Sequence, residues 1–307
     1  ESDFVKIGPK PGGDSSEGYL ANLSGVGKFI LKSGAKNAAD KSDHARNEVL
    51  ASSLYKMLRS SLFGEGTSGF HLQDAFLAKG EDGAPNKVAV RFIDGLASSP
   101  LEGMYKAGSF HFKRTILHDF ALSALLGIWD STPGNVLTIK APNGAKRLVR
   151  VDFGGALNYR SMGKKKKAGE FTGKVNELED FFKDKYSSSK LYKDIPKVKL
   201  YETILEIVGQ KVIEQKIKDT VSLYGPPDLG ERQQLVIKLL DRIHYMESYA
   251  KATLETEKAK AQAALPTAVP PAPAPKPTII GSKPLPLKLP LEPKQGKPFP
   301  DPTAAYA

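Results

Sequence analysis

Residues 126–155 read LGIWDSTPGNVLTIKAPNGAKRLVRVDFGG, and three polar side chains in this stretch are candidates for one site. Asp130 and Asn135 are five positions apart, and the Ser, Thr, Pro and Gly between them predict a turn, because no helix favours four loop formers in a row. Asp152 follows residues 148–151, which alternate as a strand, and precedes Phe-Gly-Gly, where the chain is expected to leave that strand sharply.

The sequence Pro-Asn-Gly at 142–144 predicts the turn of a hairpin that joins the two parts of this stretch. Asn135 then lies at the start of one arm and Asp152 at the end of the other, so that their oxygen atoms converge with those of Asp130. Such a cluster suits Mg²⁺, a hard cation that takes oxygen ligands and is usually bound together with phosphate groups. The alternative is that these residues only cap a turn and end a strand.

The order Asp-x-x-x-x-Asn followed by Asp-Phe-Gly resembles the catalytic segment of the protein-kinase-like superfamily. Ordinary eukaryotic protein kinases have His-Arg before the first Asp, whereas this chain has Ile-Trp at 128–129. The departure favours the atypical branch, which includes HipA-like bacterial kinases and phosphoinositide 3/4-kinases. By this resemblance Asp152 and Asn135 hold Mg²⁺ at the phosphates of ATP, and Asp130 accepts or orients the acceptor hydroxyl, although Trp129 cannot replace the contacts of the missing pair.

A lysine and a glutamate upstream extend the resemblance. Residues 27–32 alternate as a strand with Lys32 at the end, and residues 44–58 carry a helical stripe of apolar side chains with Glu48 near its start. By the resemblance these two residues form an ion pair in which Lys32 contacts phosphate oxygens and Glu48 orients it. The alternative for an isolated lysine at a strand end is a solvated side chain.

Two further segments are expected to contact the nucleotide. Residues 8–18 are rich in glycine and serine and suit a loop that cradles phosphate, although their spacing does not match GxGxxG and a flexible hairpin is the alternative. Residues 87–95 alternate strongly and are expected to run into the hinge beside the adenine. The candidate nucleotide-binding residues are Gly12, Gly13, Ser15, Ser16, Gly18, Lys32, Phe92 and Asp94.

The sequence predicts an α+β fold with the bilobal protein-kinase-like architecture, in which a strand-rich N-lobe at 1–95 precedes a helical C-lobe at 96–263. The spacing of apolar residues predicts helices at 110–128, 170–186, 198–223 and 229–264. The first of these helices delivers Asp130 to the site. It also carries His118, which is expected to be satisfied or solvent-facing rather than catalytic.

A proline-rich tail is predicted at 264–307. Thirteen of the chain's 22 prolines lie in residues 265–307, and such a composition cannot form a packed core, so we expect an extended, disordered tail. Proline-rich segments also bind aromatic-lined grooves of partner proteins. A non-catalytic binding or scaffold role through the tail is therefore an alternative function.

The composition limits the classes of partner. A formal charge of +11 favours phosphate-rich partners, and the four lysines at 164–167 lie where a kinase meets its acceptor, as either a solvated loop or a contact for an anionic group. Nucleic acid is not an expected partner, because no nucleic-acid-binding motif is found. The absence of cysteine and of any long apolar run fits a cytoplasmic protein, or a secreted effector acting in a host cytosol.

The predicted function is that of a kinase, an enzyme that uses ATP and Mg²⁺ to move the γ-phosphate to a protein hydroxyl or to a phosphoinositide-like acceptor. Another ATP-dependent transfer by the same fold, such as adenylylation, is an alternative, and so is a phosphate-binding structural protein with a decayed site. Because residue 1 is Glu rather than Met, the chain is expected to be a processed form or an excerpt.

Overall fold

The structure is a computed structural model that describes residues 4–11, 16–63, 75–79, 87–93, 96–97, 103–132, 134–140, 144 and 146–263. The chain divides into two units, Glu1–Ala264 and Leu265–Ala307. The elements below all belong to the first unit. The predictions for the proline-rich tail concern residues outside the described ranges.

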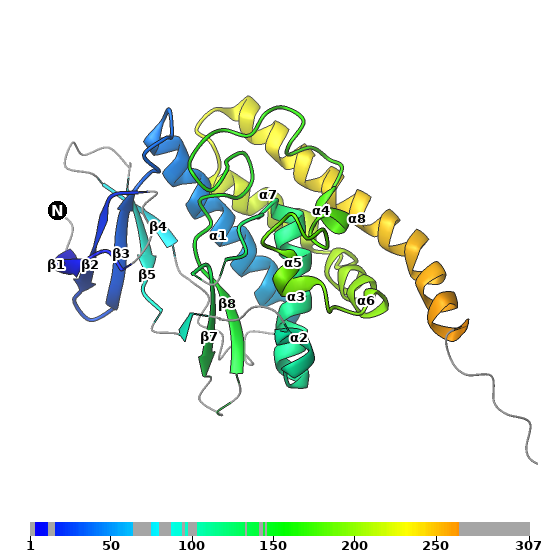
Figure 1. Ribbon diagram of the computed structural model, residues 1–307. Coiled ribbons are helices and arrows are strands. Elements are labelled where there is room, and N and C mark those ends of the chain that lie inside the picture. Colours follow the sequence, from blue (N-terminus) through cyan, green and yellow to red (C-terminus); the bar gives the residue numbers. More distant parts are fainter. Residues whose placement is uncertain are drawn as a thin grey trace, which may run out of the picture. The chain divides into compact units, whose positions relative to one another are not determined.

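An antiparallel sheet forms the N-terminal part of the chain, with the strand order β1-β2-β3-β5-β4 (Figure 1). Its strands are β1 (Phe4–Pro9), β2 (Gly18–Leu23), β3 (Gly27–Ser33), β4 (Ala75–Ala78) and β5 (Lys87–Arg91). In β3, Phe29 and Leu31 are both 2% exposed and pack on one face of the sheet. Lys32 is paired with Val88 of β5, so these two side chains share the opposite face.

Helix α1 (Lys41–Phe63) packs against that opposite face. Ala45 and Val49 of α1 form a small core with Val88 and Val90 of β5, so the face that carries Lys32 is the one that meets the helix. Further along α1, the predicted apolar stripe at positions 50, 51, 54, 55 and 58 is buried in the main core. One helix thus contacts both the sheet and the helical part of the chain.

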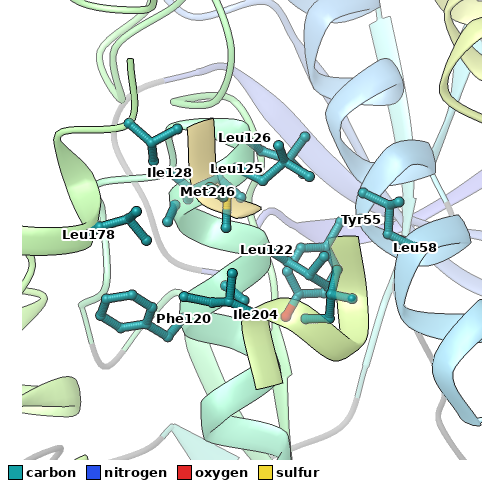
Figure 2. Close-up of a cluster of buried hydrophobic side chains, with 14 of the residues drawn as sticks. Tyr55, Leu58, Phe120, Leu122, Leu125, Leu126, Ile128, Leu178, Ile204 and Met246 are labelled. Atoms are coloured by element: carbon teal, nitrogen blue, oxygen red, sulfur yellow. The ribbon is translucent and has the colours of Figure 1, made fainter. Parts of the chain in front are cut away.

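Seven helices are described in the C-terminal part: α2 (Met104–Ala107), α3 (Phe110–Leu126), α4 (Glu177–Asp180), α5 (Ser189–Tyr192), α6 (Lys197–Val208), α7 (Ile213–Tyr224) and α8 (Leu229–Ala263). Helix α3 is the centre of the core, because every residue from 115 to 126 is buried. Figure 2 shows Phe120, Leu122, Leu125 and Leu126 of α3 among side chains from α1, α6 and α8. No helix of the part that the structure describes is long and apolar enough to cross a membrane.

The predicted α+β class is confirmed: an antiparallel, strand-rich N-terminal part precedes a helical C-terminal part, as in a bilobal kinase-like fold. The single helix predicted at 198–223 is wrong, because the chain forms two helices there, α6 and α7. Gly209 caps α6, and Val212, an apolar residue inside the predicted helix, is 52% exposed. Glycine has a low helix propensity and ends the first helix before the stripe resumes in another direction.

The helix predicted at 170–186 is also wrong in extent, since only the four residues of α4 are helical there. The residues that follow α4 form turns. These turns place Phe181 against Phe120 of α3 and Tyr192 of α5, with ring centroids 5.5 and 5.6 Å apart. Aromatic packing therefore overrides the helical spacing of the local sequence.

The predicted hairpin is present. Strands β7 (Val136–Lys140) and β8 (Lys146–Arg150) are paired antiparallel, and β6 (Leu96–Ala97) adds a short third strand beside β7. The pairing continues past the strand ends, because the Val151 N–H donates to the Asn135 carbonyl at 2.9 Å. This register places Asn135 and Asp152 at the same end of the hairpin.

Candidate active site

Lys32 lies between two carboxylates that come from different parts of the chain. Its Nζ is 2.7 Å from Oε1 of Glu48 on α1 and 3.1 Å from Oδ1 of Asp152 after β8. The side chain of Glu48 is 3% exposed and that of Lys32 12%, whereas that of Asp152 is 41% exposed. The pair predicted from sequence is thus formed, and Asp152 is the member that remains accessible to a ligand.

The charges in this group shift one another's pKa values. Burial lowers the pKa of Lys32, but the Asp152 and Glu48 carboxylates outweigh it and raise the pKa above the usual range. Burial raises the pKa of Glu48. Burial also acts to raise the pKa of Asp152, but the Lys32 ammonium reverses this effect and the pKa is lowered. Lys32 is therefore charged at neutral pH, and Asp152 is an ionised carboxylate.

Asp152 has an unusual backbone conformation for a residue other than glycine, with φ at 64°. Aspartate tolerates this left-handed region better than most residues, and its Oδ1 accepts a hydrogen bond from the Gly154 N–H at 3.2 Å. The following Phe153 is 2% exposed and packs on Tyr55 of α1. The sharp turn thus directs the carboxylate towards Lys32 and the aromatic ring into the core.

Asp130 and Asn135 lie on the turn before β7, and both side chains are half-buried. The turn is closed by the Asn135 N–H, which donates to the Thr132 carbonyl at 3.0 Å. Burial and the negative charge of Asp152 raise the pKa of Asp130, while hydrogen bonds from Asn135 and Thr132 act in the other direction. The carboxylates of Asp130 and Asp152 are therefore close enough to interact electrostatically.

The candidate residues on the nucleotide side are only partly described. Gly12, Gly13, Ser15 and Asp94 lie outside the described residues. Ser16 is buried, and its carbonyl accepts a hydrogen bond from Lys10 at 2.8 Å. Gly18 pairs with Lys32 across β2 and β3, and a Cβ there would collide with the Leu31 carbonyl. The Phe92 N–H donates to the Lys28 carbonyl at 2.9 Å, so this backbone donor is already hydrogen-bonded within the chain.

An ion pair that the sequence did not predict lies under Asp130. Arg150 and Asp119 both have side chains that are 0% exposed, and two guanidinium nitrogens of Arg150 reach the two carboxylate oxygens of Asp119 at 2.9 and 2.8 Å. A third contact runs from Nη1 of Arg150 to the Asp130 carbonyl at 3.0 Å. Asp119 lies on a helix in which every residue from 115 to 126 is buried, and a charged residue within a largely apolar helix was the available signal.

His118, next to Asp119, is 0% exposed and not solvent-facing. Burial lowers its pKa to about 3, so the ring is neutral at neutral pH. Trp129 also has a packing role: its ring lies 5.2 Å from that of Phe181 and 4.8 Å from that of Tyr186.

A cavity of about 470 Å³ opens beside Asp130. Its lining includes Trp129, Asp130, Arg160, Lys166, Glu170 and Tyr186. Within the lysine run 164–167, only Lys166 belongs to this lining, and its ammonium donates to the Gly127 carbonyl at 2.7 Å. Burial lowers the pKa of Lys166 to about 7.

The other lysines of the run point elsewhere. Lys165 lies 3.7 Å from Asp43 of α1, and Lys164 and Lys167 are exposed. The four lysines therefore differ in their surroundings. Lys166 contacts a backbone carbonyl, Lys165 pairs with α1, and Lys164 and Lys167 are exposed to solvent.

No group of three or more His, Cys, Asp or Glu side chains that could hold a metal is found among the described residues. Asp152 and Asn135 supply one carboxylate and one amide oxygen at the same end of the hairpin. This donor set is too small for an all-protein metal cage, but it fits Mg²⁺, which is commonly held by one or two carboxylates together with water and substrate phosphates.

No protein-family model matches the chain, and no curated protein sequence matches it. Among solved structures, the MAP kinase LmaMPK10 from Leishmania major is similar over 83% of this chain and 84% of that chain, with 12% sequence identity and a TM-score of 0.28. At this TM-score the likeness carries no argument about the site.

Proposed function

We propose that this chain is an ATP- and Mg²⁺-dependent phosphotransferase of the atypical kinase type, moving the γ-phosphate of ATP to a hydroxyl of a protein or of a phosphoinositide-like acceptor. The observation that carries the proposal is the position of Lys32 between Glu48 and Asp152 at 2.7 and 3.1 Å. A buried ion pair contributes little net stability compared with apolar packing, so this arrangement points to a functional site.

Lys32 and Glu48 act on the nucleotide. Glu48 is fixed on α1 and keeps the ammonium of Lys32 charged and oriented, so that its N–H groups are available to phosphate oxygens. Asp152 and Asn135 are the residues that would hold Mg²⁺, which neutralises phosphate charge during transfer. The left-handed backbone at Asp152 supports this assignment, because strained conformations concentrate at functional sites.

Asp130 acts on the acceptor. Its raised pKa makes the carboxylate a better proton acceptor than an exposed aspartate, and it lines the cavity of about 470 Å³ that is open to an acceptor. That volume lies in the range of small-molecule sites, about 300–1,000 Å³. A headgroup or a side chain that enters the cavity would bring its hydroxyl to Asp130. The proposed place of action is a cytosol, where ATP is supplied, in the protein's own cell or in a host.

The test uses ATP labelled either at the γ- or at the α-phosphate, with Mg²⁺ and a panel of protein and phosphoinositide acceptors. We expect γ-label, and no α-label, to appear in an acceptor with the parent protein, and neither label with Asp152→Asn. Asparagine keeps the shape and tolerates the left-handed backbone, so the variant should remain folded. Transfer of α-label would show nucleotidyl transfer instead. No label transfer to any acceptor and no ATP hydrolysis by the parent would contradict the proposal.

A further inference from the structure

The ion pair of Arg150 and Asp119 belongs to a larger buried group, which we call the Asp119 cluster and define as Asp119, Arg150, Tyr55, Tyr192 and Ser131. The hydroxyls of Tyr55 on α1 and Tyr192 on α5 donate to the Asp119 carboxylate at 2.6 and 2.7 Å. Nη2 of Arg150 donates to Oγ of Ser131 at 3.0 Å and to the Tyr192 hydroxyl at 3.0 Å. Each carboxylate oxygen of Asp119 therefore receives two hydrogen bonds, one from Arg150 and one from a tyrosine.

The cluster contacts the backbone of the turn that carries Asp130. Arg150 donates to the Asp130 carbonyl from Nη1 and to the Ser131 hydroxyl from Nη2, both at 3.0 Å. A planar guanidinium that is fixed on one side by a bidentate carboxylate can hold the groups on its other side in a single geometry. The turn itself is irregular, so its buried polar groups depend on partners of this kind.

We infer that Arg150, oriented by Asp119, is the positioning residue for Asp130. The Ile-Trp pair at 128–129, which precedes Asp130 in the sequence, does not supply this positioning. The inference rests on the proposed role of Asp130 in phosphoryl transfer. It adds a connection to the nucleotide side, because Tyr55 lies on the same helix as Glu48. Asp119 therefore connects the helix that orients Lys32 with the turn that carries the acceptor-side carboxylate.

The experiment compares Ser131→Ala, Arg150→Lys and Arg150→Met with two controls. Ser189→Ala removes another buried hydroxyl, whose hydrogen bond goes to the Tyr186 carbonyl. Arg242→Lys removes another guanidinium that is 0% exposed, which contacts Glu177 and the carbonyls of Leu125 and Ala124 rather than Asp130 or Ser131. The controls match the loss of a buried contact without touching the turn.

Two readouts are taken. The pKa of Asp130 is measured by carbon NMR of aspartate-labelled protein without nucleotide, and kcat and KM for ATP are measured as a function of pH. Ser131→Ala should lower kcat about tenfold at unchanged KM, with a fall in melting temperature no larger than that of Ser189→Ala, because a 1 Å misplacement of a reacting group is costly. Arg150→Met should raise the pKa of Asp130 and move the acid limb of the kcat profile to higher pH.

Arg150→Lys separates charge from geometry. It keeps the positive charge but loses the planar guanidinium that contacts Asp119 and the turn at the same time. The pKa of Asp130 should therefore stay near the parent value while kcat falls. If Arg150→Met fails to fold, Ser131→Ala and Arg150→Lys decide the matter. The inference is overturned if both controls lower kcat as much as these variants do. If the parent shows no ATP turnover, the proposed function fails. Carbon signals of Asp130 that keep the parent position in folded Arg150→Lys and Arg150→Met separately overturn the inference, because a displaced turn changes them.

Discussion

Removal of the Lys32 ammonium should lower the free energy of unfolding. Removal of the negative charge of Glu48 in the same protein should restore much of that free energy. Lys32→Met leaves the carboxylate of Glu48, which is 3% exposed, without its cation at 2.7 Å. Glu48→Gln removes the negative charge and keeps the shape. The double variant therefore replaces a buried ion pair by two neutral side chains of similar size.

The magnitude follows from the burial of the pair. Breaking a buried ion pair by removal of one partner typically costs about 3–5 kcal/mol, and the low exposure of both side chains leaves little solvent screening. For a unit of this length, each kcal/mol corresponds to roughly 2–4 °C in melting temperature. Lys32→Met should thus melt about 10 °C below the parent, and the double variant should melt closer to the parent than the sum of the single changes predicts.

The deficit of Lys32→Met should also depend on pH. Burial raises the pKa of Glu48 and Lys32 opposes this, so loss of Lys32 raises the pKa further. A group with a raised pKa in the folded state binds protons more tightly there than in the unfolded chain. Its contribution is then fully present below the unfolded pKa of about 4.3 and is lost as the pH rises through the folded value. The deficit should therefore be smaller at pH 5 than at pH 8. Glu48→Gln should remove most of this difference, because Asp152, the other carboxylate at Lys32, is 41% exposed.

The assay is denaturant unfolding of the parent, the two single variants and the double variant at pH 5 and pH 8. Lys251 and Glu247 on α8 provide the control cycle, because their ion pair at 2.6 Å is solvent-exposed and should couple by no more than about 0.5 kcal/mol. Strict additivity for Lys32 and Glu48, or a Lys32→Met deficit that is equal at both pH values, would refute this reasoning.

Three further predictions follow from the fold. Gly18→Ala should lower the melting temperature markedly, because the new Cβ collides with a backbone carbonyl of β3, and a parent-like melting curve would contradict the strand pairing. Removal of residues 265–307 should leave the melting temperature and ATP turnover unchanged, since this segment lacks apolar periodicity, and a large fall in either would show that it packs on the first unit. Replacement of Lys164, Lys165 and Lys167 by Gln should raise the KM for an anionic acceptor and weaken its dependence on salt, and an unchanged salt response would show that these three lysines do not contact the acceptor.

The parts of the fold that were predictable are those that local sequence encodes. The stripe on α1 and the hairpin of β7 and β8 follow from periodicity and turn residues within one segment. The break between α6 and α7 also has a local signal, Gly209, but the apolar spacing on both sides of it concealed the break. The turns after α4 had no local sequence signal, because the packing of Phe181 on α3 and α5 depends on residues far away in the sequence.

In the candidate site, too, some residues have a local sequence signal and others are brought together only by the fold. Short motifs identify Asp130, Asn135 and Asp152, and sequence order identifies Lys32 and Glu48. The pairing of Asp119 with Arg150 joins positions 31 residues apart, and each of them alone is an ordinary charged residue in an apolar pattern. No periodicity or motif predicts such a contact, since it arises only when α3 and β8 pack together.

The most direct test of the central claim is a calorimetric titration of a non-hydrolysable ATP analogue, with and without Mg²⁺, into the parent and into Asp152→Asn. Of the two carboxylates beside Lys32, that of Asp152 is the accessible one. We therefore expect Mg²⁺-dependent binding to depend on Asp152. The account predicts saturable binding to the parent that is strengthened by Mg²⁺, and loss of this Mg²⁺ effect in the folded variant. Binding that is equal with and without Mg²⁺ in the parent, or an equal Mg²⁺ effect in both proteins, would contradict it.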